Sequence, residues 1–375
     1  MTTFKKRPLF FLSAALFILS LVVRFQIREY VNGDLTLLQK WYDHLYINGA
    51  AGLADENFSN YPPAYLYLLW LSTLLSGWVG RIAALKLIPT LFDVLSAFII
   101  FRMARLQHDE DTAYFFASGF FILPTILFNS SGWGQIDSLY TSLLLACTYL
   151  LLKEKPFWAL IAFGAAFSFK SQSIFLLPFL GILFLKGRIR WYHFFLIPAV
   201  YIILGIPAAW IGRSWPSILS IYLEQVGQFR ILSNNAPNLY IFIPNSFYDI
   251  GLWIGLALFL LALAFWGWIN WRATIAFTHR QTMLMALAVL SLVPFVLPKM
   301  HDRYFYPADV FSYAIIIFAP EMWFVPLLYQ LISSLSYSAF LLGAPLAIVM
   351  VAALLNTGTT IYILRKQLLS LRKSK

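Results

Sequence analysis

The chain has 375 residues, of which 61% are hydrophobic and only 11% are charged. A soluble domain carries about 25% charged residues, so this composition excludes an ordinary soluble protein. The apolar residues occur in blocks of about 20, the length that an α-helix needs to cross a bilayer. These blocks predict an all-α polytopic membrane protein, in which residues 1–375 form a single transmembrane domain.

Hydropathy predicts about 12 transmembrane helices in this domain. We place them near residues 8–24, 84–104, 113–129, 138–152, 156–169, 172–185, 192–212, 250–270, 281–298, 304–319, 322–340 and 344–364. The apolar run at 64–76 is too short to cross about 30 Å of hydrocarbon, and Pro62 and Pro63 before it suit the first turn of a helix. We therefore expect a half-helix on or in the outer leaflet. It belongs to a long first outer loop, residues 25–83, that contains amphipathic surface helices.

The cationic residues predict which ends of these helices face the cytoplasm. With the N-terminus inside, most of the 27 Lys and Arg residues fall on the inner side, including those at 5–7 and 186–190. This bias agrees with the positive-inside rule. Counting 64–76 as a full span would place 186–190 outside, so we reject that topology. The net charge of +11 then reflects topology and attraction to anionic membrane lipids, and we expect no nucleic-acid partner.

Asp34 lies in the most informative polar segment, within the first outer loop. The residues that follow have the i, i+3, i+4, i+7 spacing of an amphipathic helix and are Leu38, Trp41, Tyr42 and Leu45. An aspartate just before such a stripe is either a helix N-cap or a catalytic carboxylate. The spacing does not decide between them, and the two roles are compatible because helix N-termini are often functional sites.

Two more candidates are an outer loop and a carboxylate inside a predicted span. The glycine-loosened loop at 132–137 carries Trp133 and Gln135, which could stack on and hydrogen-bond a sugar ring, whereas Asp137 more simply caps the next helix. Asp93 lies inside a predicted span, where a carboxylate is costly and is a candidate for function or helix pairing.

Lys170 and Gln172 interrupt an apolar stretch where we expect a turn between two helices. The lysine could extend its ammonium group to the membrane surface or face a cavity and bind an anionic head group. The outer loop at 213–249 could form a pocket wall through Arg230, Asn234, Asn235 and Asn238, but any solvated loop has a similar composition.

The outer loop at 299–309 is crowded with ionisable side chains. His301 and Arg303 could hold a phosphate, with the arginine as the bidentate partner. The alternative is an ordinary interfacial girdle of tyrosines and basic residues. A histidine beside Asp302 and Arg303 is unusual for a girdle, so the pattern favours function.

Several signatures are missing from the sequence. No GxxxxGK[ST] or strand-associated GxGxxG motif suggests a nucleotide site, and no HExxH or paired His/Cys spacing suggests zinc. Cys147 is the single cysteine, which excludes an intramolecular disulfide. We therefore expect neither a cofactor nor a metal ion.

Taken in chain order, these motifs resemble those of the GT-C superfamily of polytopic glycosyltransferases, which use polyprenyl-phosphate-linked sugars. The likeness is nearest to the dolichyl-phosphate-glucose glucosyltransferases of N-glycan assembly and to bacterial relatives of GPI mannosyltransferases. It extends over most of residues 1–310. Its strongest segments are Gly33-Asp34, Asn60-Tyr61-Pro62-Pro63, Gly132 to Asp137, Phe169-Lys170-Ser171-Gln172 and His301-Asp302-Arg303.

The resemblance implies that Asp34 is the general base and that His301 lies near the donor phosphate. The eukaryotic Glu-Lys after that histidine is replaced here by Asp302-Arg303. We expect Arg303 and Lys170 to help stabilise the departing lipid phosphate. The residues expected to contact substrate are Trp133, Gln135, Gln172, Tyr61 and Asp302.

The expected reaction moves a hexose from a polyprenyl-phosphate donor to a glycan or lipid acceptor. It takes place with inversion on the non-cytoplasmic face, and we expect a bacterial plasma membrane. The alternative is a transporter or a flippase for lipid-linked sugars, which intramembrane charges would suit. Transporters often contain inverted repeats. No such repeat is visible here, and the polar groups gather on one side of the membrane.

Overall fold

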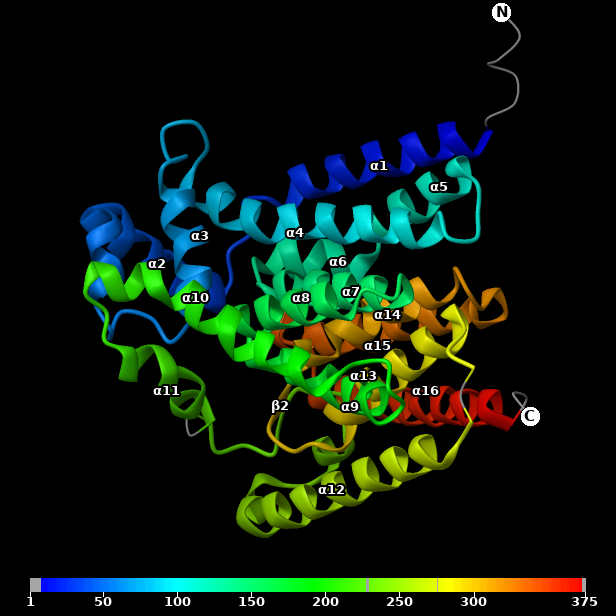
Figure 1. Cartoon of the computed structure of the whole chain (residues 1–375). Coiled ribbons are helices and arrows are strands. Elements are labelled where there is room, and N and C mark those ends of the chain that lie inside the picture. The colour runs from blue at the N-terminus through cyan, green and yellow to red at the C-terminus, as the bar shows by residue number, and fades with distance from the viewer. Residues whose placement is uncertain (1–7, 227–228, 275, 373–375) are drawn as a thin grey trace, which may run out of the picture. The chain divides into compact units, whose positions relative to one another are not determined.

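The computed structural model describes residues 8–226, 229–274 and 276–372, and it is predominantly helical (Figure 1). The basic residues expected inside at 5–7 lie outside the described residues. Seven of the described helices are long and apolar enough to cross a membrane: Pro8–Ile27, Arg81–Ala104, Trp191–Ile211, Asn245–Arg272, His279–Val296, Pro320–Leu342 and Leu346–Leu371. A multi-pass helical membrane protein is therefore confirmed. The number 12 stays a prediction, because three further apolar helices are shorter.

The described residues divide into two compact units. The first contains 8–149, 157–171 and 194–226, and the second contains 150–156, 172–193, 229–274 and 276–372. No shift in composition marks the division, because both units consist of apolar helices.

The first unit holds the N-terminal helices and one later pair. Its elements are α1 (Pro8–Ile27), α2 (Gly33–Asn48), η2 (Gly49–Ala54), α3 (Pro63–Thr73), α4 (Arg81–Ala104), α5 (Glu110–Phe121), α6 (Pro124–Leu127), η3 (Phe128–Trp133), most of α7 (Asp137–Leu152), most of α8 (Pro156–Phe169), α10 (Leu196–Ile211) and α11 (Trp215–Val226).

The amphipathic helix expected after Asp34 is α2, and its apolar stripe is buried. Leu38, Trp41, Tyr42 and Leu45 all lie in a core cluster with residues of α3, α4 and α7. The half-helix expected at 64–76 is α3, which begins at Pro63 and has 11 residues. Both predictions are confirmed as secondary structure, while the depth of α3 in the membrane stays a prediction.

The span expected at 113–129 is broken in two. Helix α5 ends at Phe121, and the next helical segment begins at Pro124 with a bend of 56°. Proline has no backbone N–H and is accommodated in the first turn of a new helix. Residues Phe128–Trp133 then form the π-helix η3, a rare conformation that is frequent at functional sites.

The second unit holds the C-terminal helices. Its elements are η4 (Ser171–Leu176), α9 (Leu177–Leu185), η5 (Trp191–Phe195), β1 (Ser233–Asn234), η6 (Leu239–Phe242), η7 (Asn245–Phe247), α12 (Tyr248–Arg272), α13 (His279–Val296), β2 (Met300–His301), η8 (Asp302–Phe305), α14 (Tyr306–Ile315), η9 (Pro320–Met322), α15 (Phe324–Leu342) and α16 (Leu346–Arg372). The first residue of η4, Ser171, and the last two residues of η5, Phe194 and Phe195, belong to the first unit.

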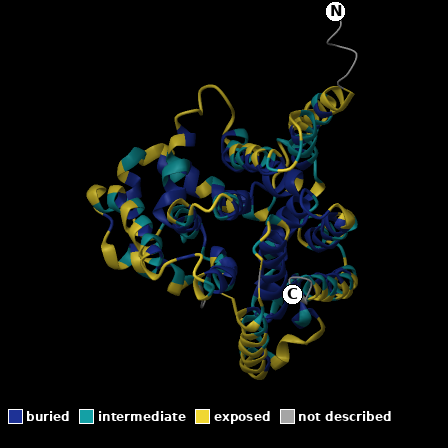
Figure 2. Ribbon diagram, turned by 45° about the vertical axis from the view of Figure 1, so that its right-hand side comes forward, coloured by how far each residue is buried: buried dark blue, intermediate teal, exposed yellow. Residues whose placement is uncertain are grey.

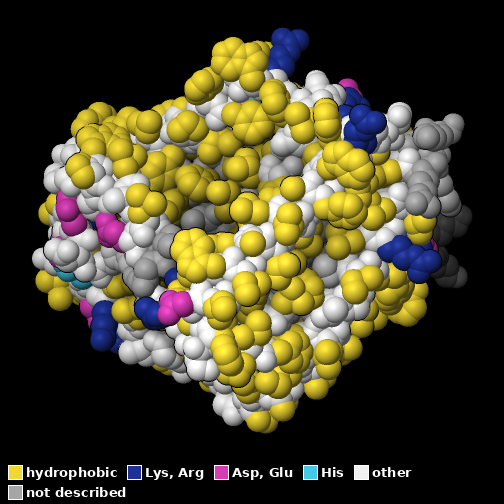
Figure 3. All heavy atoms as spheres, turned by 90° about the horizontal axis from the view of Figure 1, so that it is seen from below, with side chains coloured by type: hydrophobic (Ala, Val, Ile, Leu, Met, Phe, Trp, Pro, Cys, Tyr) yellow, Lys and Arg dark blue, Asp and Glu magenta, His cyan; other side chains and the backbone are white. Residues whose placement is uncertain are grey.

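Helix α13 is the core of the second unit, with every residue from Gln281 to Val296 buried. Its neighbour α14 is also wholly buried but has only 10 residues, shorter than the span expected at 304–319. In contrast, α12 is exposed along much of its length, as Trp253 and Leu261 illustrate. Figure 2 shows buried residues between helices and exposed residues along their outer sides, and Figure 3 shows one face covered largely by hydrophobic side chains. Such surfaces suit contact with lipid.

Candidate functional site

Asp34 lies in the first turn of α2, but it does not cap the helix. The N-cap is Asn32, whose side-chain oxygen accepts a hydrogen bond from the Leu35 amide at 3.0 Å. The alternative that Asp34 is itself the N-cap is therefore wrong. Its position in the first turn still favours a carboxylate, because the positive end of the helix dipole lies there.

Two side chains from a distant segment hold the Asp34 carboxylate. Its Oδ2 accepts a hydrogen bond from the Trp133 indole Nε1 at 3.0 Å and from the Gln135 amide Nε2 at 2.6 Å. A third hydrogen bond joins the same two segments, and here the donor lies next to α2: the Asn32 side chain donates to the backbone oxygen of Trp133 at 3.0 Å. Trp133 and Gln135 are buried, whereas Asp34 is only partly buried. The carboxylate is thus oriented from its protein side.

Gly134, between these two donors, allows the close approach. Its φ is +77°, in the left-handed region that glycine tolerates best. A Cβ built there would lie 2.8 Å from the Leu35 Cδ1 atom. The glycine-containing loop expected to be loose is instead packed tightly against the start of α2.

Lys170 and Asp137 form a buried ion pair at the start of α7. The Lys170 side chain is 8% exposed and its Nζ contacts Asp137 Oδ1, so the ammonium group does not extend to the membrane surface. The other carboxylate oxygen accepts a hydrogen bond from Asn129 at 3.0 Å. Asp137 is already the first helical residue of α7. Its side chain therefore serves tertiary contacts rather than the expected N-cap.

His301, in the second unit, is held by a residue of the 213–249 loop. Strands β1 and β2 pair in parallel with Asn234 opposite His301, and the Asn234 amide nitrogen lies 3.0 Å from His301 Nδ1. An amide nitrogen only donates, so with this amide orientation Nδ1 accepts, and the neutral ring carries its proton on Nε2. Phe229 and Tyr304 contact the ring at centroid distances of 5.3 and 5.0 Å.

Asp302 and Arg303 interact with each other directly after this histidine. The Arg303 amide donates to Asp302 Oδ1 at 2.9 Å, and its Nη1 lies 3.6 Å from the same oxygen. Asp302 is buried. The guanidinium charge is therefore placed beside a carboxylate in the loop that carries His301.

Tyr61 and Gln172 have less specific surroundings. Tyr61 is partly buried and packs between Trp41 and Tyr65, each at a centroid distance of 5.2 Å. Gln172 lies in η4 of the second unit, and its buried Oε1 accepts no hydrogen bond from the described residues.

The structure thus joins Asp34 to Trp133 and Gln135, and Lys170 to Asp137, within the first unit. Within the second unit, His301, Asp302 and Arg303 share one loop. Sequence reasoning missed Asn32, although an asparagine directly before a helical stripe is a cap signal. Among the described residues, no three His, Cys, Asp or Glu side chains gather as a metal site requires.

The comparison with known protein families indicates the class of activity. The sequence model of glycosyltransferase family 87 matches residues 58–298, which is more than half of the chain. No curated protein matches the chain. The matched range includes Trp133, Gln135 and Lys170, whereas Asp34 precedes it and His301 follows it. The match therefore identifies the activity class, and it does not cover Asp34 or His301.

Proposed function

Because the chain belongs to glycosyltransferase family 87, we propose that it moves a hexose from a polyprenyl-phosphate-linked donor to an acceptor hydroxyl. A membrane glycosyltransferase follows from the family and from the apolar helices. Family membership also favours a transferase over the transporter or flippase. The proposal adds four finer points: the donor class, an acceptor on a glycan or lipid, inversion at the anomeric carbon, and a site on the non-cytoplasmic face of a bacterial plasma membrane.

The observation that carries the proposal is the oriented carboxylate of Asp34. A general base must lie within hydrogen-bond reach of the hydroxyl it deprotonates and must point at it. Asp34 is partly exposed, while Trp133 and Gln135 hold its Oδ2 from the buried side. A carboxylate in this setting can meet a substrate without losing its direction.

One carboxylate is sufficient for the proposed transfer. Asp34 takes the proton of the acceptor hydroxyl as that oxygen forms a bond to the anomeric carbon of the sugar. The bond from the anomeric carbon to the donor phosphate oxygen breaks, and its electron pair leaves with polyprenyl phosphate. A single base without a second carboxylate nucleophile implies direct displacement with inversion, by analogy with glycosidases.

Stabilisation of the departing phosphate falls to His301 and Arg303 in the proposal. The Asn234 contact leaves the His301 proton on Nε2, the atom that would donate to a phosphate oxygen, and an arginine supplies charge and paired donors. Lys170 has a different setting, because its ammonium group is hydrogen-bonded directly to the buried Asp137 carboxylate, whereas the Arg303 guanidinium is 3.6 Å from Asp302 Oδ1. We therefore assign Lys170 to holding the start of α7 rather than to the phosphate.

The test uses purified protein in liposomes with a panel of polyprenyl-phosphate hexoses. Release of polyprenyl phosphate is measured for the parent, for Asp34→Asn and for Asp43→Asn. Asp43 is the matched control, because it lies on the same helix in an exposed ion pair with Arg81. We expect Asp34→Asn to lower kcat by about 10²–10⁴-fold, the contribution of a positioned acid or base, and Asp43→Asn to stay within about twofold, as exposed pairs contribute little.

Two outcomes would contradict the proposal. Parent-like turnover by Asp34→Asn would remove the base assignment. Transfer from a soluble nucleotide sugar, with no polyprenyl-phosphate hexose accepted, would remove the donor class while leaving the family unaffected.

A further inference from the structure

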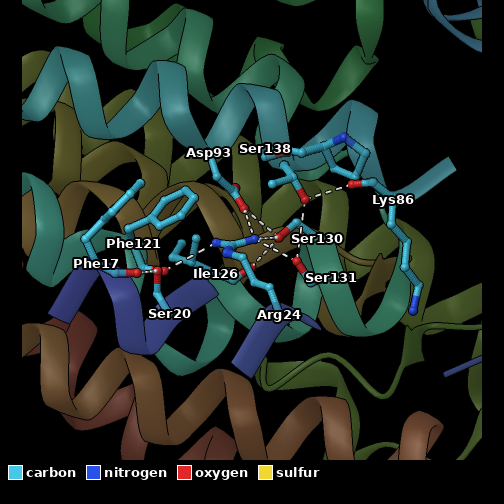
Figure 4. Close-up of polar contacts among 12 residues, drawn as sticks. Phe17, Ser20, Arg24, Lys86, Asp93, Phe121, Ile126, Ser130, Ser131 and Ser138 are labelled. Atoms are coloured by element: carbon cyan, nitrogen blue, oxygen red, sulfur yellow. Dashed lines mark hydrogen bonds and ion pairs between the residues drawn. The ribbon is translucent and has the colours of Figure 1, made fainter. Parts of the chain in front are cut away.

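An ion pair is buried between α1 and α4 of the first unit. Arg24 Nη1 lies 2.9 Å from Asp93 Oδ2, and the two side chains are 7% and 0% exposed (Figure 4). Apolar side chains of similar volume often pack at least as stably as a buried ion pair. Packing alone therefore does not explain charges at this place.

The guanidinium of Arg24 also donates hydrogen bonds to the π-helix η3. Its Nη1 donates to Ser130 Oγ at 2.8 Å and to Ser131 Oγ at 2.7 Å. Its Nη2 donates to the backbone oxygen of Phe121 at 3.3 Å, where α5 ends. Ser130 in turn contacts the Asp93 carboxylate, and Figure 4 shows these groups converging from α1, α4 and η3. One cation therefore ties η3 to two transmembrane helices.

The end of η3 carries the groups that orient Asp34. Trp133 is its last residue, and Gln135 follows after the left-handed Gly134. The Gln135 backbone amide donates to the Asn129 carbonyl inside η3 at 2.9 Å. A rotation or shift of η3 would thus carry the Trp133 indole and the Gln135 amide with it, and with them the direction of the Asp34 carboxylate.

Helix α4 also fixes the other side of this contact. Lys86 lies seven residues before Asp93, which places both on one face of the helix. Its Nζ donates to the carbonyls of Ile27 at 3.1 Å and Tyr30 at 2.7 Å. These carbonyls belong to the exit of α1 and the linker that leads to Asn32 and Asp34. The same helix face therefore positions both segments that meet at the carboxylate.

We propose that the Arg24–Asp93 pair is a positioning device for the reaction, acting on Asp34 through η3 without touching substrate. The proposal rests on Asp34 being the base. A pair that only stabilised the fold would alter the unfolding temperature and the amount of protein, whereas a positioning pair also sets the turnover of the folded enzyme.

The main test replaces the whole pair, as Arg24→Met/Asp93→Leu, so that no single charge is left buried. We expect a folded protein with a thermal unfolding midpoint close to that of the parent. Its kcat should fall by about 10-fold or more, because small misplacement of a reacting group is enough to slow catalysis by up to about 10²-fold. The KM for the polyprenyl-phosphate sugar should stay within about twofold, since donor binding is unchanged.

A second variant, Arg24→Lys, keeps the charge opposite Asp93 but replaces the planar fork that reaches Ser130, Ser131 and Phe121. We expect an intermediate loss of kcat. If the apolar double variant does not fold, the kcat of Arg24→Lys is the test, and a parent kcat in this variant would then contradict the positioning role.

The matched control is Arg81→Gln/Asp43→Asn, which removes an exposed ion pair between α4 and α2. It should keep the parent kcat, because this pair does not contact η3 through any described bond. A combined variant tests the route through η3. When the Arg24 and Asp93 substitutions are added to Gln135→Ala, the fold-decrease in kcat should be smaller than the product of the two separate decreases, because both changes act on the same contact with Asp34.

A folded Arg24→Met/Asp93→Leu enzyme with parent kcat would overturn the proposal, as would fully multiplicative losses with Gln135→Ala. These results are distinguishable from failure of the proposed function. That failure would show as an active Asp34→Asn variant, whereas an inactive Asp34→Asn beside a fully active double variant would refute the positioning role alone.

Discussion

The Asp34 contact in the first unit and the His301 loop in the second hold their key side chains in different ways. The Asp34 carboxylate accepts hydrogen bonds from two side chains of a buried segment that is itself hydrogen-bonded to α1 and α4. His301 lies beside the Asn234 amide in a two-residue strand pair and is flanked by aromatic rings. A base must point in one direction, whereas a group that binds a charged phosphate tolerates some movement. We therefore expect the first unit to be far less tolerant of substitution.

The largest expected effect is on stability at Lys170. The Lys170→Met variant leaves the Asp137 charge buried without its cation and should lower the free energy of unfolding by about 3–5 kcal/mol. The free energy of unfolding is measured by unfolding the purified protein in micelles with increasing SDS or urea. Removing both charges, as Lys170→Met/Asp137→Leu, should restore most of the loss, and Arg81→Gln in an exposed pair should cost about 0–1 kcal/mol. Equal losses in the single and double variants would contradict the paired-charge account.

The next effect tests direction at Asp34. Asp34→Glu keeps the carboxylate but moves it by one methylene, so we expect kcat to fall by about 10²-fold. Release of polyprenyl phosphate under saturating donor measures the change, with the parent and Asp34→Asn as the two limits. A Glu substitution that works as well as the parent would show that orientation by Trp133 and Gln135 is unimportant.

A smaller effect is expected at Gly134. Gly134→Ala places a side chain at a φ of +77° and 2.8 Å from Leu35, so the loop must shift at a cost of about 1–3 kcal/mol. We expect lower turnover together with reduced stability, and trimming the neighbour by Leu35→Ala should restore part of the turnover. Gly187→Ala, at a left-handed position in open space, is the control and should leave kcat unchanged.

The smallest effect is expected in the second unit. Asn234→Ala removes the described partner of His301 Nδ1, a loss of about 0.5–1.5 kcal/mol for one hydrogen bond. We expect the donor KM to rise by about 2–10-fold with kcat nearly unchanged. If kcat fell as far as in Asp34→Glu, the contrast between a directed base and a tolerant phosphate site would be lost.

Several elements were predictable because their signals are local. The apolar stripe of α2, the start of α3 at Pro63 and the helices that end at Leu152 and Phe169 all follow from periodicity, proline and hydropathy. The broken span around Pro124 was not predicted, because a continuous apolar run does not reveal where its backbone bends.

Composition and hydropathy were enough to show that this chain is a helical membrane protein and to single out Asp34 and the His301 loop. The partner of each polar side chain became known from the packing of the helices. Asp34 finds Trp133 at a separation of 99 residues, and Arg24 finds Ser131 at a separation of 107. A carboxylate or guanidinium buried among apolar helices must be paired or hydrogen-bonded, but residue type alone does not name its partner. That choice depends on how the helices pack, and here it turns an aspartate that resembled a helix cap into a directed carboxylate.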